Sequence, residues 1–233
     1  MSESVPNEID SYLVDFERLE DASSAKTPSW LQQQRQSGAS RFAELGFPTP
    51  KVEEWKYTDV APIAHTAFSP AQYELNGLQV SQLSELTFGN LNCPRLVFVN
   101  GFYSPELSSI QDLPKEVQVC SLAEVLEEDP ALVEPYLARH AKCEQHAFVS
   151  LNTAFIQDGA FVCVPPGVAL SEPIHLLYLS TASEKPVVAH PRNLIVIGED
   201  SQAAVLESYV GLQNKAYFTN LVTEIVAGAK LSQ

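Results

Sequence analysis

Basic residues are scarce in this 233-residue sequence: 14 Lys and Arg stand against 29 Asp and Glu, and the formal net charge is −15. Such a surplus of negative charge repels phosphate groups, so the composition argues against nucleic-acid binding and adsorption to anionic membranes. The surplus favours solubility, or alternatively an acidic surface that selects a basic partner. No apolar run approaches the roughly 18 residues of a membrane helix. The opening MSESVPNEID lacks the features of a secretory signal.

Signatures of catalysis and of structural metal binding are missing as well. The four cysteines, at positions 93, 120, 143 and 163, include no CxxC pair, which argues against a zinc ribbon and a thioredoxin-like motif. The GxxxxGK and GxGxxG loops are absent, as are the GxSxG elbow and the HExxH helix. We therefore expect no nucleotide site, and the cysteine usage favours a reduced, cytoplasmic compartment.

Residues 1–146 are predicted to form a mainly helical region. Gly46 is placed to cap the end of one helix, and Ser121 with Glu124 forms a capping box at the start of another. Apolar spacing, proline and capping signals predict helices over 11–20, from Pro28 to Leu45, over 121–129 and from Asp129-Pro130 onwards.

A short β-hairpin is predicted near 96–103, within this helical region. The segment LVFVNGFY contains two β-like runs on either side of Asn100-Gly101. That dipeptide suits the positive φ angles of a type I′ turn.

Residues 147–233 follow a different pattern, in which β-like runs replace helical spacing. Runs end at Gly167, Gly198 and Gly228, which are 31 and 30 residues apart. A corner that recurs at such a period is typical of a solenoid, so we predict the first rungs of a parallel β-helix, with Ala203 and Ala204 in its interior. A β-sandwich with accidental spacing is the alternative. The expected strands are 160–164, 174–179, 193–197, 203–210 and 221–226.

The sequence stops shortly after the third glycine corner, at Gln233. A β-helix that ended there would leave its last rung unpaired. We therefore expect an incomplete β-helix, taken from a longer protein or covered by another chain, with possible self-association through its open end.

One apparent cluster of metal ligands occurs, formed by His140, Cys143 and His146. On a continuous helix these three residues would share one side. The helical pattern ends here, however, so ordinary surface residues are the expected interpretation. We assign no metal-binding residue.

Other candidate residues also have a structural explanation. Acidic residues at Glu199, Asp200 and Glu207 could hold calcium in a pectate-lyase-like β-helix, but acids at a corner are expected to be solvated. Cys163 is expected to be buried and His175 to be interior or paired. The aromatic residues Trp55 and Tyr57 are expected to anchor their loop on the core. No catalytic or cofactor-binding residue is assigned.

Four segments, taken in order, resemble the SufB/SufD family of iron–sulfur cluster assembly proteins. They are ELGFPTPKVEEWKYTDV (44–60), LVFVNGFYSPELS (96–108), HAFVSLNTAFIQDGAFVCVPPGV (146–168) and PRNLIVIGEDSQAAVLESYVG (191–211). The resemblance implies an α+β fold, with an N-terminal helical region followed by a right-handed parallel β-helix. It also implies a non-catalytic scaffold of the SUF system that acts with SufB and the ATPase SufC. The absence of cysteine-rich motifs near the amino terminus favours the SufD branch.

In that family, the β-helix continues well beyond the length of this sequence. The resemblance places the groups that handle the iron–sulfur cluster, the edge that pairs with SufB and the helical domain that docks SufC in that later part. We therefore carry over no site residue, expect no cofactor bound by this chain itself, and do not expect the chain alone to capture SufC. A carbohydrate-acting parallel β-helix enzyme is the alternative function, and an unrelated interaction protein is a third.

Overall fold

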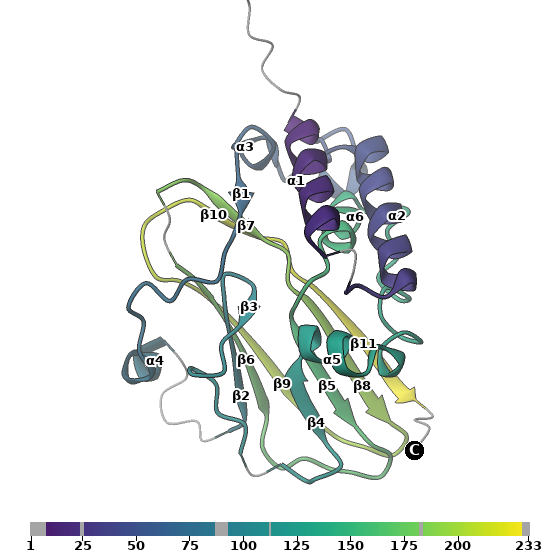
Figure 1. Ribbon diagram of the computed structural model, residues 1–233, viewed down its shortest axis with the longest axis vertical. Coiled ribbons are helices and arrows are strands. Elements are labelled where there is room, and N and C mark those ends of the chain that lie inside the picture. The colour runs from purple at the N-terminus through teal and green to yellow at the C-terminus, as the bar shows by residue number, and fades with distance from the viewer. Residues whose placement is uncertain (1–7, 24–25, 87–92, 112, 182–183, 230–233) are drawn as a thin grey trace, which may run out of the picture.

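The computed structural model describes residues 8–23, 26–86, 93–111, 113–181 and 184–229 (Figure 1). This part of the chain is an α+β structure in which helices pack beside a strand-rich body. The helices are α1 (Glu8–Ser23), α2 (Ser29–Leu45), η1 (Glu53–Trp55), α3 (Ala61–Ala64), α4 (Val80–Leu86), α5 (Leu122–Glu128), η2 (Pro130–Leu132) and α6 (Ala147–Ala154). The strands are β1 (Ser69–Pro70), β2 (Arg95–Val99), β3 (Phe102–Tyr103), β4 (Gln118–Ser121), β5 (Ala160–Val164), β6 (Ile174–Ser180), β7 (Val187–Ala189), β8 (Arg192–Gly198), β9 (Val205–Gly211), β10 (Tyr217–Thr219) and β11 (Val222–Ala229).

The described strands form three sheets, in the orders β1-β7-β10, β11-β8-β5-β4 and β3-β2-β6-β9. The pairs β2–β3 and β4–β5 are antiparallel, and the remaining pairs are parallel. Each sheet contains a parallel pair whose partners are roughly 30 residues apart. Examples are Cys163 opposite Val196, His175 opposite Leu206 and Val187 opposite Tyr217.

The recurring glycines lie at equivalent places in successive passes of the chain. The Gly167 N–H donates to the Glu199 carbonyl at 2.9 Å, one residue beyond Gly198. Gly198 pairs with Ala229, one residue beyond the third glycine. A Cβ at Gly198 would lie 2.4 Å from the backbone nitrogen of Pro166, so this close approach requires glycine. The period seen in the sequence is therefore a period of the strand ladders.

Strand β5 is buried on both faces because it separates two apolar clusters. Ala160, Val162 and Val164 belong to an inner cluster that the two four-stranded sheets share. Phe161 and Cys163 belong to an outer cluster that includes residues of α5. Successive side chains of a strand point to opposite faces, so a strand between two cores is apolar at every position.

Three aromatic rings are stacked through the inner cluster, one from each of β2, β6 and β9. The Phe98 and Tyr178 centroids are 4.9 Å apart, and those of Tyr178 and Tyr209 are 5.3 Å apart. Tyr209 closes the series with 52% of its surface exposed. The series therefore ends in a ring that the described residues leave half uncovered.

The three sheets all have a late strand at one edge: β9, β10 or β11. Each of these strands carries a large exposed hydrophobic residue, namely Tyr209, Tyr217 and Ile225 respectively. Ile225 has 62% of its surface exposed, although it lies within an eight-residue strand. We call the surface formed by β9, β10 and β11 the late edge.

Helices α1, α2 and α6 pack together beside the sheets (Figure 1). Gly38 of α2 allows the closest contact, because a Cβ there would lie 2.7 Å from backbone atoms of Ala154 and Ser150 in α6. Helix α6 corrects the expectation that strand structure begins at about residue 147. Its residues 150–154 are all buried, including the polar Ser150, Asn152 and Thr153, so polar and apolar residues do not separate into a solvent face and a core face.

The local signals at the hairpin and the helix ends are confirmed. Phe98 pairs with Tyr103 across a turn in which Asn100 and Gly101 have φ angles of 54° and 90°. The Gly46 N–H donates to the Phe42 carbonyl at 2.8 Å. The helices expected over 11–20 and from Pro28 to Leu45 form as α1 and α2, and the Ser121 hydroxyl accepts from the Glu124 N–H at 3.3 Å.

Other expectations are corrected by the structure. The helix expected from Asp129-Pro130 is only the single turn η2, followed by further turns. Pro135 has no N–H to continue a helical ladder, and Ala138 further along adopts a positive φ of 59°. Ala204 is exposed, since its neighbours Ala203 and Val205 pack against the inner cluster and strand alternation turns Ala204 outwards. The short strands β1, β4, β7 and β10 were not expected at all. The division between residues 146 and 147 stays a prediction, although β2 shares a sheet with β6 and β4 shares one with β5.

Candidate functional site

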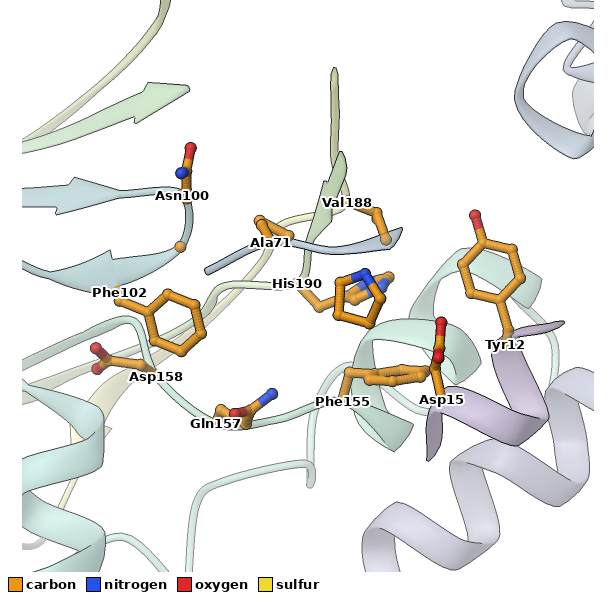
Figure 2. A pocket seen from close by; sticks show the side chains of 13 residues that line it. Tyr12, Asp15, Ala71, Asn100, Phe102, Phe155, Gln157, Asp158, Val188 and His190 are labelled. Carbon is orange, nitrogen blue, oxygen red and sulfur yellow. The ribbon is translucent and has the colours of Figure 1, made fainter. Parts of the chain in front are cut away.

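A pocket lies where α1, the β2–β3 hairpin, the segment after α6 and the end of β7 meet (Figure 2). Its volume is about 30 Å³. Figure 2 shows two groups of side chains around it: Tyr12, Asp15, Phe155 and His190 on one side, and Asn100, Phe102 and Asp158 on the other.

The Asp158 carboxylate holds together the elements on one side of this pocket. It accepts hydrogen bonds from the backbone N–H groups of Tyr103 at 2.7 Å, Ala123 at 3.2 Å and Gly159 at 2.8 Å, and from the Ser121 hydroxyl at 2.7 Å. Burial raises the pKa of Asp158, and these four donors oppose the rise. Asp158 therefore joins the hairpin, β4, α5 and β5.

Gly159 is required beside this carboxylate. Its φ is 152°, and a Cβ there would lie 2.0 Å from the Arg192 carbonyl oxygen. Only glycine combines that backbone conformation with so close an approach of another strand. The Asp158-Gly159 pair thus fixes the start of β5 against β8.

The other side of the pocket carries a histidine, a tyrosine and an aspartate. His190 stacks on Phe155 with ring centroids 4.8 Å apart, and burial lowers the pKa of His190 to about 3. Burial, followed by the charge of Asp15, raises the pKa of the Tyr12 phenol. Burial raises the pKa of Asp15 too, and Arg18 at 3.0 Å opposes that change. The pocket is thus equipped for hydrogen bonding with a neutral imidazole and a protonated phenol.

A second polar cluster, around Arg192 and Glu224, is buried between β8, β11 and α6. The Arg192 guanidinium donates to Glu224 Oε1 at 2.8 and 3.0 Å and to Asn152 Oδ1 at 2.9 Å. Both side chains of the ion pair have 0% exposure. The carboxylate also accepts from the backbone N–H groups of Ala138 at 2.7 Å, His140 at 2.8 Å and Ala141 at 3.0 Å. These bonds attach the segment 138–141 to β11.

This ion pair was not predicted from the sequence, although a signal for it existed. Arg192 and Glu224 are opposite charges inside two apolar strands, close to one repeat period apart in the sequence. In the ladder, Arg192 opposes Val222 and Leu194 opposes Glu224, so the two charges are diagonal neighbours on one face.

The apparent metal-ligand cluster is not assembled. His140, Cys143 and His146 lie in turns before α6 and not on a continuous helix. The Cys143 carbonyl accepts from Ser150, and the His146 ring lies 3.7 Å from the Glu54 carboxylate. Within the described ranges, no group of three His, Cys, Asp or Glu residues could hold a metal ion.

The acidic residues considered for calcium do not converge either. Glu199 and Asp200 lie in an exposed turn, as expected. Glu207 accepts hydrogen bonds from Asn193 Nδ2 at 3.1 Å, Thr223 Oγ1 at 2.7 Å and the Tyr209 hydroxyl at 2.6 Å. Glu207 is therefore a structural residue of the last two passes of the chain.

The remaining single residues mostly follow expectation. Cys163 is buried, and burial raises the pKa of its thiol. His175 is buried and its Nε2 lies 2.9 Å from the Ser208 hydroxyl; burial, then Arg95, lowers its pKa. Trp55 packs against Phe148 at 5.2 Å, but Tyr57 is 91% exposed and is not an anchor. Its exposed ring contacts only the neighbouring lysine among the interactions seen here.

No helix in the described part of the chain has both the length and the apolar character needed to cross a membrane.

Comparison with known proteins places these features in a family. Residues 6–176 match the family described as "SufBD protein N-terminal region". An iron–sulfur cluster assembly SufBD family protein of Synechocystis is 32% identical over 86% of this chain and 45% of its own length. The iron–sulfur cluster assembly protein SufD of Bacillus subtilis is 27% identical over 88% of this chain and 47% of its own.

The iron–sulfur cluster assembly protein SufD of Escherichia coli is also 27% identical, over 80% of this chain and 41% of its own length. The chain thus spans less than half the length of these three relatives. The family match covers well over half of the chain, and it includes the hairpin, Asp158-Gly159 and β5. The chain belongs to the SufBD family of iron–sulfur cluster assembly proteins.

Proposed function

We propose that this chain acts as a non-catalytic scaffold in iron–sulfur cluster assembly, together with SufB and the ATPase SufC. The observation that carries the proposal is the late edge, where three sheets present the strands β9, β10 and β11. Exposed strand edges with apolar side chains favour pairing with further strands. A scaffold requires such surfaces for its partners, whereas an enzyme requires a site for a substrate.

We further propose that the sheets are the first rungs of a right-handed parallel β-helix. The parallel ladders with partners roughly 30 residues apart support this interpretation. So does the stacked series Phe98, Tyr178 and Tyr209, since equivalent positions of successive rungs lie above one another. Parallel crossovers are right-handed in nearly all known cases, which supports the handedness.

The division of labour within such a complex agrees with the motifs that the sequence lacks. There is no phosphate-binding loop in the sequence, so ATP hydrolysis is assigned to SufC. The iron–sulfur cluster would be a transient cargo of the whole assembly. No specific observation favours the carbohydrate-acting enzyme, because the acidic residues Glu199, Asp200 and Glu207 do not converge on an open site.

Co-purification tests the proposal. The tagged chain is co-expressed with SufB and SufC from the same organism, and the material retained on the tag is identified by mass spectrometry. We expect the late edge to retain SufB, although the resemblance by itself places the edge that pairs with SufB in later rungs, and we expect SufC to be retained only when SufB is present. Recovery of the tagged chain without either protein would contradict a scaffold role.

A matched pair of variants locates the contact. Ile225→Lys places a charge on the late edge, whereas Val14→Lys places one on the exposed face of α1, where Val14 is 44% exposed. We expect the first variant to lose SufB and the second to retain it. Loss of SufB in both variants would show that the late edge is not the contact.

A further inference from the structure

Buried polar atoms without hydrogen-bond partners among the described residues indicate that the pocket of Figure 2 binds a small molecule. Four buried side-chain polar atoms lack a hydrogen-bond partner among the described residues, and two of them belong to residues that line this one pocket. These two are the hydroxyl of Tyr12 and Nε2 of His190. A buried polar group without a partner costs about 1–3 kcal/mol, so two at one small pocket call for an explanation.

The tautomer of His190 follows from its neighbour Asn220. The Asn220 amide nitrogen Nδ2 donates to the Phe148 carbonyl at 2.9 Å, and a carbonyl can only accept, so the orientation of this amide is fixed. The same Nδ2 lies 3.2 Å from Nδ1 of His190, which must therefore be the acceptor. A neutral imidazole with an unprotonated Nδ1 carries its proton on Nε2. Nε2–H is thus a donor that faces no acceptor among the residues that the structure describes.

The pocket's size and charges restrict the ligand. A volume of about 30 Å³ exceeds the roughly 10–15 Å³ that one water molecule requires on this measure, so the pocket accommodates water and little more. An anion would be repelled by the Asp15 carboxylate, which lines the same pocket. A metal ion would meet the Nε2–H donor of His190 in place of a ligand, and no group of three His, Cys, Asp or Glu residues in the described ranges could hold one. Water accepts from one group and donates to the other, so it satisfies both.

We propose that this pocket binds one or two ordered water molecules that link Tyr12 and Asp15 of α1 to His190 after β7. The first water accepts a hydrogen bond from His190 Nε2–H. The same water or a second one forms hydrogen bonds with the Tyr12 hydroxyl and the Asp15 carboxylate. Helix α1 is then joined to the sheets partly through solvent and partly through direct aromatic contacts. The ring of Tyr12 makes such contacts with Phe42 at 5.8 Å and Phe47 at 5.7 Å.

The sign of a stability change tests the proposal. Tyr12→Phe removes the hydroxyl and keeps the ring. If water satisfies that hydroxyl, the melting temperature falls by about 2–4 °C, the shift expected for one lost hydrogen bond in a chain of this size. If the pocket is dry, the same variant removes an unsatisfied group and the melting temperature stays level or rises. Tyr57→Phe is the matched control, because the Tyr57 ring is almost fully exposed.

A spectroscopic measurement gives an independent readout in the unmodified chain. Long-range ¹H–¹⁵N spectra of His190 should show the proton on Nε2, and cross-relaxation should connect this proton to a bound water. A melting temperature of Tyr12→Phe at or above that of the unmodified chain would overturn the proposal. So would an Nε2 proton without a water contact, and this second criterion applies even if the variant does not fold.

Discussion

Two buried arginines organise the two halves of this molecule in different ways. Arg192 joins strands β8 and β11 through Glu224, and both side chains have 0% exposure. Arg35 joins α1 and α2 to the segment after α6, with 5% exposure against 16% for its partner Glu20. Arg35 also donates from Nε to the Ile156 carbonyl at 2.9 Å.

The difference lies in what neutralises each charge. Arg192 depends on one buried carboxylate, which in turn holds three backbone N–H groups of 138–141. Arg35 donates to the Ile156 carbonyl and to the hydroxyls of Ser23 and Thr27, besides its contact with the Glu20 carboxylate at 3.3 Å. A buried cation needs a counter-charge when neutral acceptors are few, and much less when they surround it. The strand region should therefore be more sensitive to the loss of a carboxylate than the helical region.

The largest effect is expected for Glu224→Gln. This change leaves Arg192 buried without a counter-charge and should lower the free energy of unfolding by about 3–5 kcal/mol. Urea denaturation followed by circular dichroism measures the loss. Glu199→Gln in the exposed turn is the control, with an expected change within about 0.5 kcal/mol. An equally small change for Glu224→Gln would show that Arg192 does not depend on its counter-charge.

Arg35→Met should follow, with a loss of about 2–3 kcal/mol, because the Ile156 carbonyl loses its donors while the helices keep their apolar contacts. Arg41→Met on the same helix is the control, since Arg41 is partly exposed and pairs with Glu44 on the surface. Unfolding in urea compares the two variants. A loss for Arg35→Met larger than that for Glu224→Gln would reverse the proposed order.

The acid response should separate the two regions further. Burial opposes ionisation of Glu224, but Arg192 and the backbone donors prevail and lower its pKa below the ordinary 4.5. Because the folded pKa is depressed, the stabilisation is present above pH 4.5 and is lost as the pH falls through the folded value. The unmodified chain should thus lose stability below about pH 4.5, and Glu224→Gln should lose less. Parallel curves for the two proteins between pH 3 and 6 would contradict this assignment.

The smallest effect is expected for Glu20→Gln, under about 1 kcal/mol, because this carboxylate is partly solvated and Arg35 retains its neutral acceptors. Thermal unfolding at matched pH measures it. A loss comparable with that of Glu224→Gln would mean that Arg35 also depends on its counter-charge.

Local features of this fold could be predicted from the sequence, whereas features that depend on register could not. The Asn100-Gly101 turn and the Ser121 cap involve neighbours in the sequence, and both are confirmed. The glycine period located the parallel ladders, yet β7 and β10 have only three residues each and give too little pattern to detect. Helix α6 was missed because it is buried on nearly all sides.

The pocket was beyond the reach of sequence patterns for a related reason. Its lining comes from segments far apart, including Tyr12, Gly101, Phe155 and His190, and no local motif connects them. The Arg192–Glu224 pair is intermediate, because two opposite charges about one period apart could have been found once the period was known. Long-range sites therefore become predictable only after the register is established.

The spacing of the parallel strands has a consequence for the order in which the chain folds. His175 of β6 pairs with Leu206 of β9 across 31 residues, whereas Leu96 of β2 pairs with Leu176 of β6 across 80. Closing the longer loop costs about 0.8 kcal/mol more in chain entropy. The β6–β9 ladder should therefore nucleate before β2 joins it, so that two strands synthesised after β2 serve as the template on which this earlier strand is later aligned.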